Sequence, residues 1–151
     1  MPHNLFVSGL FLFDLLMAPA VVVLDIGIAG LLIPLLCSSA LVAYLLLRSK
    51  KTTSWFVAAH WRLACSHGLW LLMGYAVSAA LIFVAWLVSM GARDANMEHI
   101  VWIALTRIAL MPSLIMVMVT AVLEASAIPL VAKREVPDKL AAKFPPPDTA
   151  N

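Results

Sequence analysis

Residues 26–47 form an apolar run of twenty-two residues that contains no charged side chain. About 20 apolar residues of helix cross the hydrocarbon core of a bilayer, so this run predicts a transmembrane helix. Two further runs of similar length lie at residues 66–90 and 100–123, and only Arg107 interrupts the second of them. We therefore expect an all-α integral membrane protein built as a small helical bundle.

The composition supports this fold class. Hydrophobic residues make up 64% of the chain and charged residues 12%, and the mean hydropathy is +1.01. These values are too apolar for a soluble domain with a hydrated surface, so the lipid bilayer is the expected partner. Eight of the ten basic residues cluster in two regions beside the apolar runs, so nothing in the sequence supports nucleic-acid binding.

The number of spans depends on the N-terminal segment at residues 5–24. It is long enough to cross a membrane, but Asp14 lies at its middle, and a central Asp costs about 2.5–3.5 kcal/mol on insertion scales. Its many Leu, Phe and Val residues can offset that cost. We expect four spans, at residues 5–24, 26–47, 66–90 and 100–123; the alternative is three, with the first segment interfacial or re-entrant.

The distribution of Lys and Arg predicts the orientation, because cytoplasmic loops carry the excess of these residues. Residues 48–65 and the tail after Leu123 each hold four, whereas residues 91–99 hold one Arg against two acids. The sequence thus predicts a multi-pass protein of a bacterial-type inner (plasma) membrane with a cytoplasmic C-terminus. Residues 1–132 would form the transmembrane domain, and residues 133–151 a polar, Pro-rich cytoplasmic tail.

Residues at the ends of the expected spans predict local structure there. A tight turn at residues 24–27 would join the first two helices, with Gly27 relaxing the backbone. Residues 55–65 should be helical near the inner surface, leading into the third span with a bend at His67 and Gly68. The amphipathic rings expected in an aromatic belt there are those of Trp55, Phe56 and Trp61.

Charged side chains inside the spans are the most informative residues for function, because an unpaired charge there is costly and usually faces the bundle interior. The intramembrane polar candidates are Asp14, Asp25, Arg107 and Glu124. Arg107 lies at a depth between those expected for Asp25 and Asp14, so we predict that it pairs with one of these acids; the alternative is that it reaches outward to the headgroups. Pro112 should kink or open the helix nearby.

Cofactor and catalytic signals are weak. His60 and His67, seven residues apart on one helix face, are weak candidates for binding a haem, which needs histidines from facing helices at matched depth. Cys37 and Cys65 form no CxxC pair, and the methionines follow no repeated spacing. We therefore expect no cofactor, no metal and no catalytic residue, and hence no enzyme.

Three functional hypotheses follow from physical type. The first is a non-enzymatic accessory or assembly subunit of a larger membrane complex, whose partners would be other membrane subunits. The second is a small transporter or channel component, functioning as a homo-oligomer, with a polar route marked by Asp14, Arg107 and Glu124. The third is an anchor associated with quinone or haem that uses His60 or His67.

Overall fold

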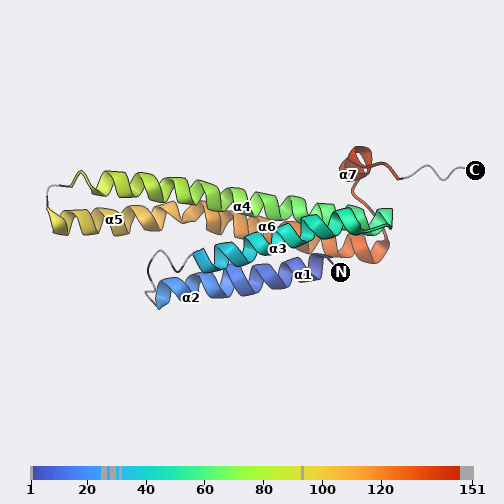
Figure 1. Cartoon of the computed structure of the whole chain (residues 1–151), viewed down its shortest axis with the longest axis horizontal. Coiled ribbons are helices and arrows are strands. Elements are labelled where there is room, and N and C mark those ends of the chain that lie inside the picture. The colour runs from blue at the N-terminus through green and yellow to red at the C-terminus, as the bar shows by residue number, and fades with distance from the viewer. Residues whose placement is uncertain (1, 25–26, 28–29, 31, 93, 147–151) are drawn as a thin grey trace, which may run out of the picture.

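A computed structural model gives the fold and describes residues 2–24, 27, 30, 32–92 and 94–146 (Figure 1). The described part of the chain contains helices joined by short turns, and no strands. In chain order the elements are α1 (Pro2–Gly9), the π-helix η1 (Leu10–Met17), α2 (Ala18–Val23), α3 (Leu32–Lys51), α4 (Trp55–Ser89), α5 (Ala95–Ala109), α6 (Met111–Lys133) and α7 (Asp138–Lys143).

Four helical rods are long and apolar enough to cross a membrane, as expected. The first runs through α1, η1 and α2 over Pro2–Val21, the second is α3, the third is α4, and the fourth joins α5 and α6 over Ala95–Lys133. The first rod packs against α3, α4 and α6, and it buries Phe6 and Leu10. It is thus an integral part of the bundle, which agrees with the four-span expectation rather than with a separate surface segment.

The helix ends differ from the expected span ends. Span α4 begins at Trp55 and α6 ends at Lys133, because a helix satisfies its own backbone hydrogen bonds and can continue past the apolar run into the headgroup region. Helix α3 as described begins at Leu32 rather than at residue 26. Gly27 has φ +82, the left-handed conformation that the turn was expected to need.

Helix α4 runs without interruption through the position where a bend was expected. A Cβ added at Gly68 would lie 2.6 Å from Val42 Cγ2 and 3.3 Å from Phe6 Cε2. Gly68 therefore brings α1 and α3 close to α4 instead of breaking the helix. The predicted opening near Pro112 is confirmed, because Leu110 separates α5 from α6 there.

A hydrophobic core fills the half of the bundle where all four rods overlap. Its buried members are Phe6, Leu10, Val42, Leu45, Trp61, Ala64, Cys65, Leu71 and Val117. Trp61 is only 8% exposed and meets the ring of Tyr44 edge-on at 6.0 Å, so its assignment to an aromatic belt was wrong. Both cysteines are free.

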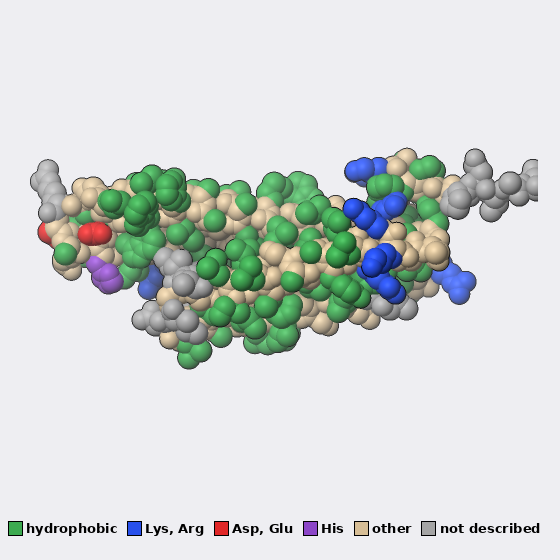
Figure 2. Space-filling model, viewed as in Figure 1, with side chains coloured by type: hydrophobic (Ala, Val, Ile, Leu, Met, Phe, Trp, Pro, Cys, Tyr) green, Lys and Arg blue, Asp and Glu red, His purple; other side chains and the backbone are tan. Residues whose placement is uncertain are grey.

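The bundle has chemically different ends. Figure 2 shows most Lys and Arg side chains gathered where α3 ends and α4 begins, and the visible acidic side chains at the opposite end. We call these the basic end and the hairpin end, the latter formed by the turn between α4 and α5. At about 1.5 Å per residue, the 35 residues of α4 span roughly 52 Å. Helices α4 and α5 therefore extend beyond α2 and α3 at the hairpin end (Figure 1).

The tail returns to the basic end of the bundle. Trp55 Nε1 donates a hydrogen bond to the Phe144 carbonyl at 2.9 Å, and the Arg62 guanidinium lies 4.1 Å from the centre of the Phe144 ring. The Pro-rich tail thus contains a short helix, α7, and makes a specific contact with α4.

Candidate functional site

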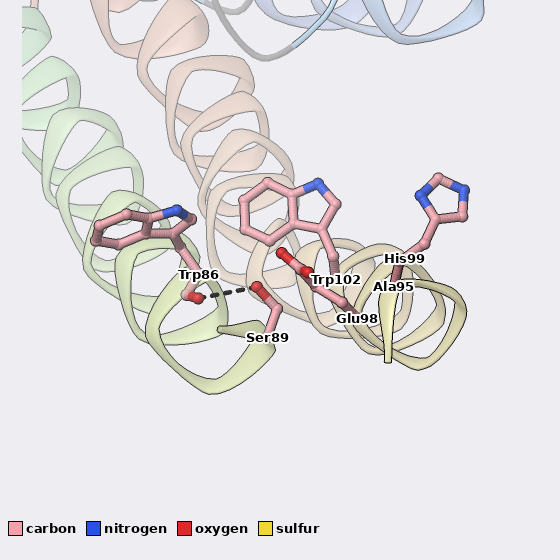
Figure 3. Close-up of a pocket in the computed structure, with 6 residues that line it drawn as sticks. All are labelled: Trp86, Ser89, Ala95, Glu98, His99 and Trp102. Carbon is pink, nitrogen blue, oxygen red and sulfur yellow. Dashed lines mark hydrogen bonds between the residues drawn. The ribbon is translucent and has the colours of Figure 1, made fainter. Parts of the chain in front are cut away.

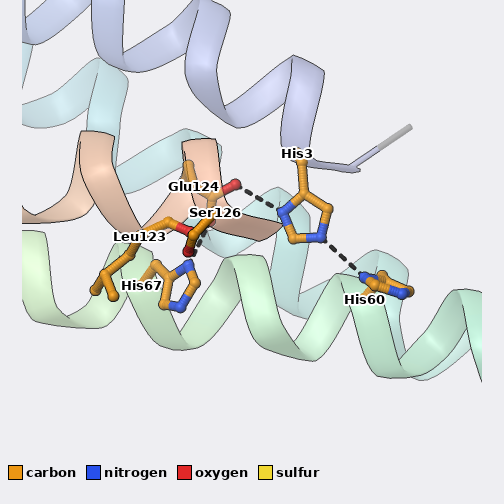
Figure 4. Close-up of polar contacts among 6 residues, drawn as sticks. All are labelled: His3, His60, His67, Leu123, Glu124 and Ser126. Atoms are coloured by element: carbon orange, nitrogen blue, oxygen red, sulfur yellow. Dashed lines mark hydrogen bonds and ion pairs between the residues drawn. The ribbon is translucent and has the colours of Figure 1, made fainter. Parts of the chain in front are cut away.

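Glu124 of α6 lies at the centre of a buried polar cluster near the basic end (Figure 4). Its side chain is fully buried, and each carboxyl oxygen has an imidazole partner. His3 Nδ1 lies 2.7 Å from Oε2, and His67 Nδ1 lies 2.6 Å from Oε1. Burying a carboxyl group in an apolar bundle is costly, and imidazole partners of this kind lower that cost.

The hydrogen bonds continue from His3 toward the tail. His3 Nε2 lies 3.0 Å from His60 Nδ1, and His60 Nε2 donates to the Glu135 carbonyl at 3.1 Å. His3 and His60 are 1% and 2% exposed, whereas Glu135 lies at the surface. One continuous series of hydrogen bonds therefore runs from the surface at the basic end to a fully buried carboxyl. We call His60, His3, Glu124 and His67 the imidazole–carboxyl chain.

Three helices position these four side chains. His60 and His67 lie two turns apart on one face of α4, as their seven-residue spacing predicted. Glu124 occupies the buried face of α6, whose other buried residues are Ser113, Val117, Thr120 and Ala127. His3 enters because α1 begins at Pro2 and packs between α4 and α6.

The geometry sets the number of protons in the cluster. Its four hydrogen bonds each need one proton between the two heavy atoms that they join. Three neutral imidazoles supply three protons, and a carboxylate supplies none. A fourth proton must therefore reside in the imidazole–carboxyl chain. It lies on Glu124 as a carboxylic acid, or on His3 or His60 as an imidazolium. In each case the cluster is neutral overall, which suits its burial.

Asp14 forms a second polar site farther from the basic end. Ser38 Oγ of α3 lies 2.9 and 3.0 Å from the two carboxyl oxygens, and the Tyr75 hydroxyl of α4 donates to Oδ1. The Asp14 side chain is 3% exposed. It lies in η1, and π-helical turns are rare and frequently occur at functional sites.

The predicted ion pair between Arg107 and Asp14 is absent from the described residues. Arg107 is exposed on α5, and Asp14 takes its hydrogen bonds from Ser38 and Tyr75 instead. The depth of a residue along the bundle does not fix the direction in which its side chain leaves the helix. Asp25, the other predicted partner, lies outside the described residues. Arg107 therefore does not join Asp14 and Glu124 in the bundle interior, and the hypothesis of a polar route through Arg107 was wrong for this residue.

An apolar layer separates the two polar sites. Leu10, Leu71 and Val117 are buried in the core between them. Thr120, one turn before Glu124 on α6, has a buried hydroxyl without a hydrogen-bond partner among the described residues. The imidazole–carboxyl chain thus ends inside the bundle and does not connect to Asp14.

The cluster does not resemble a haem or metal site. The rings of His3 and His60 meet edge-on at 86° with centroids 5.2 Å apart, and they are hydrogen-bonded directly to each other. Bis-histidine haem ligation needs two imidazoles on opposite faces of a macrocycle. Within the described residues, no group of three metal-ligand side chains is arranged to hold an ion.

A shallow hollow of about 360 Å³ lies at the hairpin end (Figure 3). Trp86 of α4 and Trp102 of α5 flank it, while His99 points away. Ser89 Oγ is occupied by a hydrogen bond to the Trp86 carbonyl at 2.8 Å. Indole rings at this end match the aromatic belt expected where helices reach the headgroups, so we assign the hollow no chemistry.

No pattern in the sequence pointed to three of the residues that form the two polar sites, namely His3, Ser38 and Tyr75. His3 stood too close to the terminus to be expected in the interior, and Ser38 and Tyr75 are common residue types in apolar helices. The heptad-like spacing of the polar and small residues Ser113, Thr120 and Glu124 is the signal that could have identified the buried face of α6.

The chain was also compared with known proteins. No family model, curated protein or solved structure matches it. Function must therefore be inferred from the arrangement of the polar groups within the bundle.

Proposed function

We propose that the chain is a small proton-coupled membrane protein, a transporter or channel component whose imidazole–carboxyl chain takes up a proton at the basic end and carries it to Glu124. The observation that carries the proposal is the continuous hydrogen-bonded series from the Glu135 carbonyl to Glu124, which requires one exchangeable proton beyond those of neutral histidines. Ionisable groups buried in transmembrane helices commonly mark proton relays.

Uptake would proceed by a concerted shift. Without the fourth proton, Glu124 is a carboxylate, His3 carries its proton on Nδ1, and His60 carries its proton on Nδ1, leaving His60 Nε2 bare. A proton that binds His60 Nε2 lets the Nδ1 proton pass to His3 Nε2. The Nδ1 proton of His3 then passes to Glu124 Oε2, and all three imidazoles end neutral.

The apolar layer beyond Glu124 determines the kind of transport that we propose. Leu71 and Val117 leave no hydrogen-bonded path from Glu124 to Asp14 in this conformation. A proton on Glu124 is therefore held until a rearrangement or entering water carries it on, so we expect gated proton passage that is slower than through an open channel but faster than through lipid alone.

The distribution of charge supports an orientation for this function. We place the basic end and the C-terminus on the cytoplasmic side of a bacterial-type inner membrane, because Arg48, Lys50, Lys51 and Arg62 cluster there. The chain would then exchange protons with the cytoplasm beneath the tail.

Proton flux in liposomes tests the proposal. Purified protein is reconstituted with an enclosed pH-sensitive dye, and a potassium gradient with valinomycin drives proton entry. We expect protons to enter faster than in protein-free liposomes when the liposomes contain the wild type or the exposed-site control Arg107→Leu. With Glu124→Gln, the rate of proton entry should fall to that of protein-free liposomes. A wild-type rate equal to that of protein-free liposomes, or equal to that of Glu124→Gln, would overturn the proposal.

A second candidate is a non-enzymatic subunit of a larger membrane complex. The observation in its favour is the extension of α4 and α5 beyond α2 and α3, where large apolar side chains such as Phe83, Leu87 and Ile108 are exposed. Another membrane subunit could cover this surface. Purification in a mild detergent distinguishes the two candidate functions. A partner protein that co-purifies in stoichiometric amount favours the complex subunit, whereas a chain isolated alone or as a homo-oligomer opposes it.

A further inference from the structure

A cavity lies beside Asp14, on the side of the bundle away from the imidazole–carboxyl chain. It has a volume of about 460 Å³ and is enclosed by η1, α2, α3, α4 and α6. Its polar lining consists of Asp14, Tyr75, Ser78 and Ser113, and Leu32 and Leu114 stand at its exposed rim. A cavity of this size with apolar walls and few polar groups is typical of sites for drug-sized molecules.

Most of the polar groups that line the cavity are already occupied. Ser78 Oγ accepts from the Ser113 backbone N–H at 3.1 Å, and Ser113 Oγ donates to the Leu110 carbonyl at 2.7 Å. The Tyr75 hydroxyl donates to Asp14. A carboxylate has about four acceptor positions, whereas Asp14 receives two hydroxyl protons, one from Tyr75 and one that Ser38 shares between both carboxyl oxygens. The cavity therefore offers a free acceptor at Asp14 and one hydroxyl donor, that of Ser78.

The lack of a basic partner for Asp14 narrows the class of ligand that this cavity can bind. Glu124 has two imidazole partners, whereas among the described residues Asp14 makes no contact with a basic group and has only two hydroxyl donors. A buried carboxylate without a positive partner is costly, and a cation in the cavity would lower that cost. An uncharged carbonyl compound such as a quinone could accept from the Ser78 hydroxyl, but it would leave the Asp14 carboxyl without a partner of opposite charge.

From these observations we propose that the cavity binds a lipophilic ammonium ion, with its apolar body between α3 and α6 and its N–H directed at Asp14 Oδ2. The rim at Leu32 and Leu114 lets such a molecule enter from the lipid-facing surface. Because η1 places Asp14 against this cavity, the rare π-helical geometry and the ligand site coincide. The inference goes beyond the proton relay and does not depend on it.

Equilibrium binding to the full chain in nanodiscs of zwitterionic lipid tests the site. The probe is radiolabelled imipramine, a tricyclic tertiary amine, and its uncharged ring system, iminodibenzyl, serves as the neutral comparison. We expect Asp14→Asn to weaken imipramine binding roughly tenfold or more, since it removes a charge-assisted hydrogen bond. Iminodibenzyl should bind weakly and equally to both proteins.

Two further variants keep the test decisive. Leu114→Trp fills the rim without touching Asp14 and should also block binding, which guards against misfolding of Asp14→Asn. Glu124→Gln should bind imipramine like the wild type, so that failure of the relay and failure of this site are distinguishable. Equal affinity of imipramine for the wild type and Asp14→Asn, or equal retention of iminodibenzyl and imipramine, would overturn the proposal.

Discussion

His3 and Glu124 are separated by 121 positions in the sequence, yet His3 Nδ1 lies 2.7 Å from Glu124 Oε2 in the interior of the bundle. This contact joins the first turn of α1 to α6. With the contacts to His60 and His67, it creates a cluster that holds one proton more than its neutral imidazoles supply.

Glu124→Gln should preserve the stability of the bundle. The amide can donate to His3 Nδ1 from its nitrogen and accept from His67 Nδ1 at its oxygen, so it imitates the protonated acid. Glu124→Ala should instead leave two buried imidazole nitrogens without partners, at a cost of about 1–3 kcal/mol each. Unfolding in detergent followed by circular dichroism compares the two variants. A Gln variant as unstable as the Ala variant would contradict the hydrogen-bond pattern.

Arg107 and Asp14 should be energetically independent. Because Arg107 is exposed and Asp14 is bonded to Ser38 and Tyr75, the effects of Arg107→Leu and Asp14→Asn on unfolding should add to within about 0.5 kcal/mol. A double-mutant cycle measures this. A coupling energy well above that value would restore the ion pair that the sequence suggested.

The tail should be held by Phe144. Phe144→Ala removes the ring beneath the Arg62 guanidinium, a contact worth about 0.5–1 kcal/mol at an exposed site. Limited proteolysis should therefore cut the segment at residues 134–146 several times faster in this variant. Lys139→Ala, in the same short helix α7, is the matched control and should be cut at the wild-type rate. Equal rates for all three proteins would mean that the ring does not anchor the tail.

The two ends of the bundle should lie on opposite sides of the membrane. In a background with Cys37 and Cys65 replaced by Ala, Thr53→Cys marks the basic end and Asn96→Cys the hairpin end; both positions are exposed. An impermeant thiol reagent added to intact cells should label Asn96→Cys only. Labelling of Thr53→Cys from outside would reverse the proposed orientation.

The sequence was sufficient for the fold class because the bilayer requires about 20 apolar residues per helix, and the four runs satisfy that requirement independently of one another. It also placed His60 and His67 on one face of α4, since helical spacing alone decides that. It could not bring His3 to Glu124, because that contact depends on how α1 packs between α4 and α6. The predicted pair of Arg107 with Asp14 was wrong for a related reason: residue count gives depth, whereas the rotation of α5 about its axis decides whether a side chain faces Asp14 or the surface.

The fourth proton is tested most directly by ¹⁵N nuclear magnetic resonance of histidine-labelled protein in bilayers, recorded over a range of pH. With the proton present, His60 carries hydrogen on Nε2 and donates to the Glu135 carbonyl. Raising the pH removes the proton, and we predict that the His60 hydrogen then moves to Nδ1, facing His3. In Glu124→Gln, where the amide donor replaces the proton, His60 should keep its Nε2 hydrogen throughout. A His60 tautomer that never changes in the wild type, or one that changes in the same way in Glu124→Gln, would contradict the proton relay.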